Sequence, residues 1–356
     1  MTTLTTLLGI RHPIIQAPMA GFGTPQLAAA VTEAGGLGSL ALGAGTAAQA
    51  HAAITALQAL TGGPFNVNLF THAPAQADPA REARWLDYLA PHFARTGQPA
   101  PAALREIYRS FLADPDMLEV LVRTRPAVVS FHFGLPTAHQ IDALHGAGCV
   151  LMATATNPVE ARAIEAAGID VIVAQGYEAG GHRGIFDPDV PDPALGTFAL
   201  VRLLARAVRI PVVAAGGIMD GQGIAAALRL GAGGAQMGTA FLASPEANTS
   251  AHHRALLAQP GLGTAVTATI SGRPARGIVN PFFSEIGAAG HPPPPDYPVA
   301  YDAAKALHAA ASSQGILDYS VNWAGQAYAL ARPLPAAELV RTLVAEMHDT
   351  IDTREV

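Results

Sequence analysis

The sequence predicts an α/β fold, a (β/α)8 TIM barrel with a helical lid or second small domain inserted after the last strand. Two observations lead to this prediction. Eight short apolar runs alternate with Ala/Leu-rich helical runs, and 50% of the 356 residues are hydrophobic whereas only 13% are charged. Near-continuous apolar runs are typical of parallel strands that are buried on both faces. Right-handed crossovers between such strands build a barrel or, as the second possibility, a doubly wound sheet.

The expected strands and helices alternate in order along the chain. Several of the helical runs end in glycine, which is a common stop signal at a helix C-terminus. We expect strands at residues 14–18, 37–41, 65–70, 128–133, 150–153, 171–175, 212–215 and 235–237. We expect the clearest helices at residues 25–34, 47–60, 158–167, 197–207 and 221–230.

Two long segments interrupt this alternation. Residues 71–125 carry clusters of Arg, Tyr and Trp, and residues 245–335 contain HPPPPDYP and an Ala-rich helix. Insertions after barrel strands lie on the C-terminal face, where barrel enzymes have their active sites, so both segments are candidates for a lid. We expect an FMN-binding barrel over 1–244, a small helical substrate-covering domain over 245–335, and a C-terminal helix within 336–356 that returns to the barrel.

Composition excludes several classes of protein. The 21 basic and 27 acidic residues give a net charge of -6 without a basic stripe, so nucleic acid is not an expected partner. No leader peptide and no run of ~20 apolar residues is present, so we expect a cytoplasmic protein without a membrane span. The single cysteine, Cys149, excludes an intramolecular disulfide framework and a Cys-based zinc site. H-E-x-x-H is also missing, and we expect no metal.

Glycines that follow the last two predicted strands indicate a phosphate site. Gly216 and Gly217 follow the seventh strand, and residues 236–239 (Gln-Met-Gly-Thr) close the eighth. Bare backbone and a helix N-terminus at this place in a barrel are suited to a phosphate group. The segment from Gly221 also spells G-x-G-x-x-A, the dinucleotide fingerprint, but the acidic residue expected about 20 positions later is missing, so we discount it.

Two histidines are candidates for the active site. His182 follows Gly180 and Gly181 in the loop after the sixth strand, where two glycines leave room for a flat cofactor beneath an imidazole. His132 ends the fourth strand in SFHFG, and for this residue a structural role is equally open.

Tyr301 and Lys305 match the pattern Y-x-x-x-K, which places a phenol and an ammonium on one helix face. Short-chain dehydrogenases use this pair for catalysis. They also need a glycine-rich loop after the first strand, where this chain has QAPMAG, so the dehydrogenase interpretation is disfavoured. Lys305 is also the only lysine in the chain.

Several segments together resemble the nitronate monooxygenase family, in particular its FMN-dependent class I members, formerly named 2-nitropropane dioxygenases. They are PIIQAPMAG, GTPQLAAAVTEAGGLGSL, PFNVNLF, AQGYEAGGHRG, AAGGI, QMGTAFL, YPVAYDAAKAL and WAGQA, within residues 10–330. The early barrel motifs are shared with other FMN barrels, including enoyl-acyl-carrier reductases and inosinate dehydrogenases. The Tyr/Lys cluster with WAGQA is more particular to class I, although Ala327 stands where the family usually has Gly.

The resemblance implies FMN across the barrel mouth and His182 as the catalytic histidine. Of two asparagines in the third strand we prefer Asn68, because we expect Asn66 to point to the other face of the strand. The implied cofactor-binding residues are Ala17, Pro18, Met19, Asn68, Gln175, Gly180, Gly181, Gly217, Gln236, Met237, Gly238 and Thr239. The implied substrate-binding residues are His132, Tyr108, Tyr297, Tyr301 and Lys305.

The implied reaction is the oxidation of an alkyl nitronate such as propionate 3-nitronate by O2, through a flavin semiquinone, to a carbonyl compound and nitrite. Lys305 and the phenols suit an anionic substrate, and His182 is suited to hydrogen-bond the nitro group or to act as base toward a neutral nitroalkane. We therefore expect nitronate detoxification by a monomer or homodimer whose partners are a small nitronate and O2. One alternative is an FMN-dependent NAD(P)H:quinone or enoyl-thioester reductase of the same barrel superfamily, and another is a non-redox phosphate-binding barrel.

Overall fold

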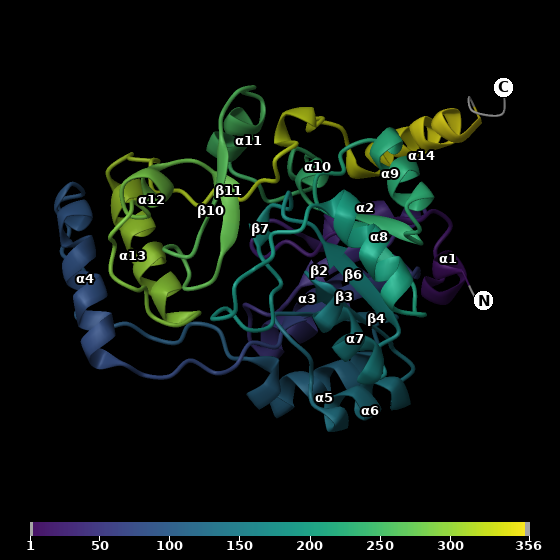
Figure 1. Cartoon of the computed structure of the whole chain (residues 1–356), viewed down its shortest axis with the longest axis horizontal. Coiled ribbons are helices and arrows are strands. Elements are labelled where there is room, and N and C mark those ends of the chain that lie inside the picture. The colour runs from purple at the N-terminus through teal and green to yellow at the C-terminus, as the bar shows by residue number, and fades with distance from the viewer. Residues whose placement is uncertain (1–2, 353–356) are drawn as a thin grey trace.

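Eight parallel strands form one closed sheet in the computed structural model, which describes residues 3–352 (Figure 1). The strands are β1 (Ile14–Gln16), β2 (Gly38–Ala41), β3 (Phe65–Phe70), β4 (Val128–His132), β5 (Val150–Ala155), β6 (Val171–Gln175), β8 (Val212–Ala215) and β9 (Gly234–Met237). Their order in the sheet is β1-β9-β8-β6-β5-β4-β3-β2, and a bridge between Ile15 and Leu37 closes the ring. The predicted (β/α)8 barrel is confirmed, and each expected strand overlaps one of these eight.

Helices surround the sheet, and the five expected ones are present. The barrel helices are α2 (Pro25–Glu33), α3 (Ala47–Gln58), α5 (Pro115–Thr124), α6 (Ala138–Gly146), α7 (Pro158–Ala166), α8 (Thr197–Ala207), α9 (Gly221–Arg229) and α14 (Ala336–Asp352). Thr46 and Thr137 begin α3 and α6 with reciprocal capping boxes, which satisfy backbone N–H groups at the helix starts. Helix α14 packs against α9 and α2. Residues 1–2 and 353–356, included in the predicted ranges, lie outside the described residues.

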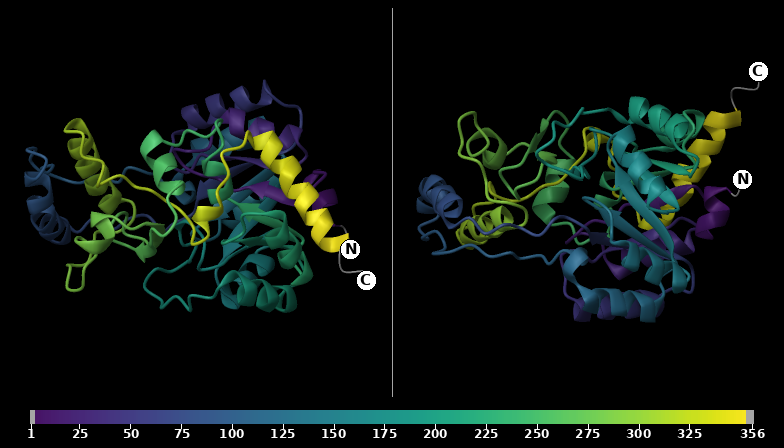
Figure 2. Two further views of the ribbon diagram at one scale, coloured as in Figure 1. Left: turned by 90° about the horizontal axis from the view of Figure 1, so that it is seen from above. Right: turned by 60° about the horizontal axis from the view of Figure 1, so that its bottom comes forward.

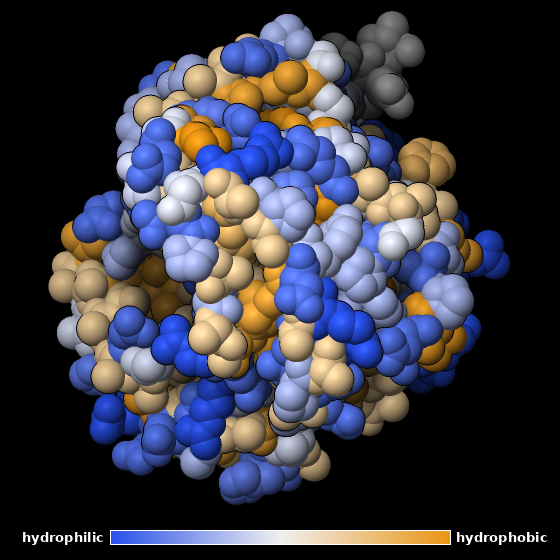
Figure 3. Space-filling model, turned by 90° about the vertical axis from the view of Figure 1, so that its left-hand side faces the viewer, coloured by the Kyte–Doolittle hydropathy of each residue, from blue (hydrophilic) through white to orange (hydrophobic). Residues whose placement is uncertain are grey.

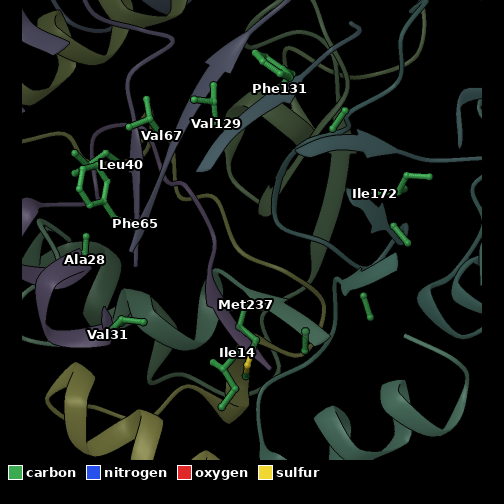
Figure 4. Close-up of a cluster of buried hydrophobic side chains, with 14 of the residues drawn as sticks. Ile14, Ala28, Val31, Leu40, Phe65, Val67, Val129, Phe131, Ile172 and Met237 are labelled. Carbon is green, nitrogen blue, oxygen red and sulfur yellow. The ribbon is translucent and has the colours of Figure 1, made fainter. Parts of the chain in front are cut away.

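Successive strand residues face two different cores. Outward-facing side chains such as Ile14, Val67 and Phe131 pack with the helices in the main hydrophobic cluster (Figure 4). Inward-facing side chains such as Ile15 and Val171 form a second cluster inside the barrel. Because both faces of each strand are buried, the strands read as continuous apolar runs rather than as alternating ones.

The short helix α1 (Leu4–Leu8) closes the N-terminal end of the barrel. Leu4 and Leu8 are buried in the inner cluster beneath the first layer of strand residues. The two ends of the described chain lie on the same side of the molecule, away from the inserted segments (Figures 1 and 2). This arrangement leaves the opposite, C-terminal end of the barrel free for a site.

The inserted segments pack on each other beyond the C-terminal end of the barrel. They contain α4 (Pro79–Ala94), η1 (Phe111–Ala113), α11 (Ala251–Leu257), α12 (Pro281–Ser284), α13 (Val299–Ser313) and η2 (Tyr328–Leu330), while the short α10 (Thr239–Leu242) directly follows β9. Trp85 and Phe93 of α4 share one hydrophobic cluster with Phe282 and Leu307, so the two insertions have a common core. On the outer face that they form, apolar areas are small and interrupted by hydrophilic side chains (Figure 3). The proposed division at residue 244 stays a prediction.

A second, three-stranded sheet lies between the barrel and α13 and was not predicted. It consists of β7 (Gly181–His182), β10 (Thr264–Thr267) and β11 (Ala275–Ile278), in the order β10-β11-β7. Its strands are antiparallel and as short as two residues, so no sequence period reveals them. This sheet fixes His182 above the barrel mouth. Among the described residues, we find no helix with the length and apolar character needed to cross a membrane.

Candidate active site

A cavity of about 550 Å³ opens at the C-terminal ends of the barrel strands. Barrel enzymes place their active sites at this end, and the volume lies within the range of ligand pockets. Both insertions and the small sheet contribute to its walls. It is lined by every residue predicted to hold a cofactor or substrate, namely Ala17, Pro18, Met19, Asn68, Tyr108, His132, Gln175, Gly180, Gly181, His182, Gly217, Gln236, Met237, Gly238, Thr239, Tyr297, Tyr301 and Lys305.

Polar side chains of the barrel interior form the floor of the cavity. Asn68 donates from Nδ2 to the Oγ atom of Ser130 at 3.0 Å, which leaves its Oδ1 atom without a hydrogen-bond partner among the described residues. Asn66 points into the same interior and donates to the Oγ atom of Ser39 at 3.1 Å. The prediction that Asn66 faces away is therefore wrong, because residues two apart in a strand share a face. Asn66 lies one layer deeper and does not line the cavity.

Glycine backbone forms part of the cavity wall. Gly181 and Gly217 have φ angles of 75° and 72°, in the left-handed region that favours glycine. A Cβ atom on Gly181 would meet nothing within 4 Å, so its backbone faces open space. A Cβ atom on Gly180 would instead lie 2.5 Å from the backbone nitrogen of Gly325. Gly180 is thus needed where the WAGQA segment, residues 323–327, packs against the loop before His182.

His182 is held from several sides. Its backbone carbonyl accepts hydrogen bonds from Nε2 of Gln175 at 2.8 Å and from Nε2 of His132 at 3.1 Å. Its own Nε2 lies 2.8 Å from the Oγ atom of Ser271, while its ring centroid lies 5.6 Å from that of Tyr297. The Nδ1 atom has no hydrogen-bond partner among the described residues. The imidazole is therefore fixed in place and carries one unpartnered nitrogen at the cavity.

His132 lines the cavity, but both of its ring nitrogens are already in use. Because a carbonyl only accepts, Nε2 of His132 carries the proton that it donates to the His182 carbonyl. Nδ1 then accepts from the hydroxyl of Thr154 at 3.0 Å. The ring is saturated by these two bonds, which favours a supporting role over direct substrate binding.

Tyrosines from both insertions meet above the floor. Tyr108 comes from the segment after α4, whereas Tyr301 and Lys305 lie one turn apart on α13. The ring centroids of Tyr108 and Tyr301 are 5.9 Å apart, and that of Tyr297 lies 6.3 Å from Tyr108. The Y-x-x-x-K pair therefore lies at a cavity roofed by two further tyrosines, Tyr108 and Tyr297, rather than along a Rossmann-type sheet.

Burial holds the histidines and tyrosines around the cavity in their neutral forms. It lowers the pKa of His182 to about 3, and the neighbouring His132 and the Arg273 guanidinium act in the same direction. Burial lowers the pKa of His132 to about 4. It also raises the pKa of Tyr108 to about 12. At neutral pH the imidazoles are uncharged and the phenol is a hydrogen-bond donor.

Phe133 and Arg273 support the site from behind and were not predicted. Phe133 has a φ of 78°, which ends β4 at His132, one residue before the expected end. Left-handed backbone at a non-glycine residue is concentrated at functional sites. The guanidinium carbon of Arg273 lies 4.6 Å from the centroid of the Phe133 ring, and Nη1 donates to the carbonyl of Ile185 at 2.7 Å. Arg273 is buried and forms no ion pair within residues 3–352.

The cavity has positive but no negative formal charge. No aspartate or glutamate stands among the lining residues of the described chain, and Lys305 is the lining residue with a formal positive charge. Burial lowers the pKa of Lys305, which the carboxylate of Asp302 opposes. With Arg273 behind Phe133, this distribution is suited to an anion.

Trp323, Ser271 and Arg273 are the main site residues that sequence reasoning missed. The Trp323 ring lies 5.2 Å from that of His182 and lines the cavity. WAGQA is one of the segments that carry the family resemblance, but the resemblance assigns no role to its tryptophan. Ser271 and Arg273 belong to the segment SGRPAR. Its one signal in the sequence is Arg273, a charged residue between glycine and proline in a chain that has few charges.

The residues present fit a flavin mononucleotide. The polar floor offers a flat heterocycle two groups that have no hydrogen-bond partner among the described residues. They are the Oδ1 atom of Asn68 and the side-chain amide of Gln236. Bare backbone at Gly181 and Gly217 allows a close approach, as a phosphate requires. Nothing in the lining would repel a phosphate by its formal charge.

Comparisons with known proteins agree with this geometry. A family model described as nitronate monooxygenase matches residues 1–346. The nitronate monooxygenase of Pseudomonas aeruginosa is 57% identical over 344 residues, covering 96% of this chain and 98% of that protein. The solved structure of nitroalkane oxidase from Streptomyces ansochromogenes is 41% identical with a TM-score of 0.88, covering 97% of this chain and 98% of that one. FabK from Thermotoga maritima is 31% identical with a TM-score of 0.75, covering 100% and 99%.

A TIM barrel with a cavity at its C-terminal end, roofed by tyrosines and a lysine, together with these relatives identifies an oxidoreductase of the flavin type. The chain belongs to the nitronate monooxygenase family.

Proposed function

We propose that the protein oxidises small alkyl nitronates with O2 and FMN, giving a carbonyl compound and nitrite, with propionate 3-nitronate as a substrate. The observation that carries this proposal is the charge of the cavity. A nitronate is an anion, and Lys305 is the group with a formal positive charge among the lining residues of the described chain. The proposal is further supported by the similarity to relatives named nitronate monooxygenase.

The residues that would hold FMN follow from the cavity. Asn68 and Gln236 would hydrogen-bond the ring, residues 17–19 would pack against it, and the backbone at Gly181 and Gly217, beside Gly180 and Gly238, would approach the ribityl phosphate. When bound, FMN supplies the electron transfer from substrate and the reaction with O2. The protein supplies the orientation and the electrostatic environment.

The substrate would lie between this floor and the tyrosine roof. Phenol O–H groups of Tyr108, Tyr297 and Tyr301 are donors at neutral pH and suit the oxygens of a nitro group or nitronate. Their burial raises the pKa of each, so they stay protonated. Lys305 would balance the charge of the anion.

His182 would act on neutral nitroalkanes by removing the proton next to the nitro group. The low pKa of this imidazole, about 3, makes it a weak base in the absence of an anionic partner. A nitronate has already lost that proton and does not need the base. We therefore propose that nitronates are used in preference to neutral nitroalkanes.

A reductase using NAD(P)H is the second candidate, because the early barrel motifs, such as PIIQAPMAG, also resemble those of FMN-dependent enoyl-acyl-carrier reductases. Two assays separate the candidates. The purified protein, which we expect to carry FMN, is mixed with propionate 3-nitronate in air, and oxygen uptake and nitrite are measured. In parallel its visible spectrum is followed under anaerobic NADPH.

Nitrite formation with stoichiometric oxygen uptake supports the oxidation of nitronates. Rapid bleaching by NADPH without nitrite from nitronate supports the reductase. A colourless protein that FMN does not reconstitute contradicts both candidates. That result would favour the remaining alternative, a non-redox phosphate-binding barrel.

A further inference from the structure

The Ser271–Arg273 turn contacts the catalytic histidine but has no place in the function proposed above. Ser271 is fully buried, and its Oγ atom is 2.8 Å from Nε2 of His182. Gly272 has a φ of 89°, and a Cβ atom there would lie 2.5 Å from the carbonyl oxygen of Pro295. The turn is thus packed tightly beneath the segment that leads to Tyr297, and Ser271 has little freedom to move.

The hydrogen bonds around the Ser271 hydroxyl are satisfied by one assignment of donors and acceptors. Its Oγ atom lies 3.1 Å from the carbonyl oxygen of Arg273, which can only accept, and 3.3 Å from the backbone nitrogen of Arg273, which can only donate. A serine hydroxyl has a single proton. When that proton goes to the Arg273 carbonyl, the Nε2 atom of His182 must be the donor to Oγ. Turning the hydroxyl toward His182 would deprive this carbonyl of its donor.

The other nitrogen of His182 is then the basic one. The imidazole is neutral, since burial and the nearby Arg273 cation oppose its protonation, so one nitrogen carries a proton and the other a lone pair. The ring is surrounded by Phe133, Tyr297 and Trp323, none of which is an anion. Nδ1 has no partner among the described residues and is the nitrogen left for the substrate.

We propose that Ser271 is a positioning residue that keeps the proton of His182 on Nε2 and thereby presents the Nδ1 lone pair to the substrate. This role rests on the proposed function, since it specifies which atom of His182 meets the nitroalkane. In the reaction, Nδ1 takes the proton from the carbon next to the nitro group. The C–H electron pair becomes the C=N bond of the nitronate, and the imidazolium later returns the proton to solvent.

One consequence follows for anionic substrates. A neutral His182 with its proton on Nε2 accepts at Nδ1 and cannot donate a hydrogen bond to a nitronate oxygen. The phenols and Lys305 must therefore supply the donors. Ser271 should matter for neutral nitroalkanes and much less for nitronates.

The deciding experiment is a ¹⁵N NMR measurement of the histidine tautomers in the purified holoenzyme labelled with [¹⁵N]histidine. His182→Gln identifies the signals of His182 by their loss. We expect the wild-type protein at pH 7 to have His182 protonated at Nε2 only. Protonation at Nδ1, or at both nitrogens, would overturn the proposal.

Two variants test the part played by the hydroxyl. Ser271→Ala should change the tautomer signals of His182, and Ser271→Thr, which keeps a hydroxyl, should restore them. Thr269→Ala is the matched control, because it removes a buried hydroxyl that donates to the carbonyl of Phe282 at 3.0 Å and does not touch His182. Signals of His182 that are unchanged in Ser271→Ala, or changed equally in Thr269→Ala, would contradict the role of Ser271.

Kinetics provide a second readout, using nitroethane and ethyl nitronate as probes. We expect Ser271→Ala to lower kcat/KM for nitroethane roughly tenfold more than for the nitronate, which is less than the about 10²–10⁴-fold contribution of a positioned base because His182 itself remains. Equal losses for the two probes would contradict the role. Because the NMR signals do not depend on turnover, they test Ser271 even if the protein does not oxidise nitronates.

Discussion

The Nζ atom of Lys305 lies 4.8 Å from the centroid of the Tyr108 ring. The two residues come from different insertions, and Tyr301 completes the contact with its centroid 5.3 Å from the same Nζ atom. Aromatic faces stabilise an ammonium by about 0.5–2 kcal/mol and hold it where it is needed. The lysine is therefore directed to the cavity although its side chain is exposed.

We predict that Lys305→Met raises KM for propionate 3-nitronate about tenfold while kcat changes little, because one charge-assisted contact is lost. KM for neutral nitroethane should stay within about twofold, since no charge is involved. Lys305→Arg is the matched variant that keeps the charge. Steady-state oxygen uptake measures both constants, and equal effects on the two substrates would argue against an electrostatic role.

The single lysine also permits a chemical test of the same charge. We expect acetylation of the native protein, which neutralises Lys305, to raise KM for the nitronate as Lys305→Met does. Reductive methylation keeps the charge and should leave KM nearly unchanged. Mass spectrometry locates the modification, and Lys305→Met treated in parallel reports any effect of modifying the amino terminus.

We predict that His182→Ala lowers kcat/KM for nitroethane by about 10²–10⁴-fold, the usual contribution of a general base, and leaves most of the activity with ethyl nitronate. The reason is that the nitronate has already lost the proton that the base removes. Oxygen uptake with both substrates is the measurement. The flavin content of the variant, read from its visible absorbance, is the control, and loss of the flavin would indicate a structural histidine instead.

We predict that Gly180→Ala destabilises the protein by about 1–3 kcal/mol, as expected for overpacking. The added Cβ atom would collide with the backbone of Ala324 and Gly325, and the backbone cannot move without displacing Trp323. Gly146→Ala is the control, because a Cβ atom there meets nothing within 4 Å. Thermal unfolding compares the two variants, and equal stability would show that the WAGQA segment shifts without cost.

We predict a loss of stability in mild acid that His253→Phe reduces. His253 is buried against Phe22, neither of its ring nitrogens has a hydrogen-bond partner within residues 3–352, and burial lowers its pKa from 6.5 to about 4. Below pH 6.5 the unfolded chain binds a proton that the folded protein does not, so the free energy of unfolding falls as pH drops toward 4. For this group the fall between pH 7 and pH 5 is about 2 kcal/mol.

Chemical denaturation at pH 7 and pH 5 measures this effect. The variant should lose less stability between the two pH values than the wild-type protein. His139→Phe is a control at an exposed position, where the pH dependence should stay as in the wild type. A parallel fall in all three proteins would mean that other groups control the acid sensitivity.

Much of the barrel could be predicted because its signals are local. Each strand is buried on both faces, as in Val171–Gln175, and each such run is continuous in the sequence. The second sheet could not be predicted, since its strand Gly181–His182 has two residues and pairs with residues near 275. The two-residue period of a strand places the side chains of Asn66 and Asn68 on the same face, so the inward direction of Asn66 could have been predicted from the sequence.

The sequence by itself determined the barrel, the glycines at its mouth, and the residue types His182, Tyr301 and Lys305 that give the site its character. Only the tertiary structure decided how these residues are held. His132 proved to be saturated by Thr154 and the His182 carbonyl, and Ser271 proved to contact the His182 ring. The physical reason is that a hydrogen bond depends on distance and direction in space, and no periodicity in the chain encodes a contact between residues so far apart.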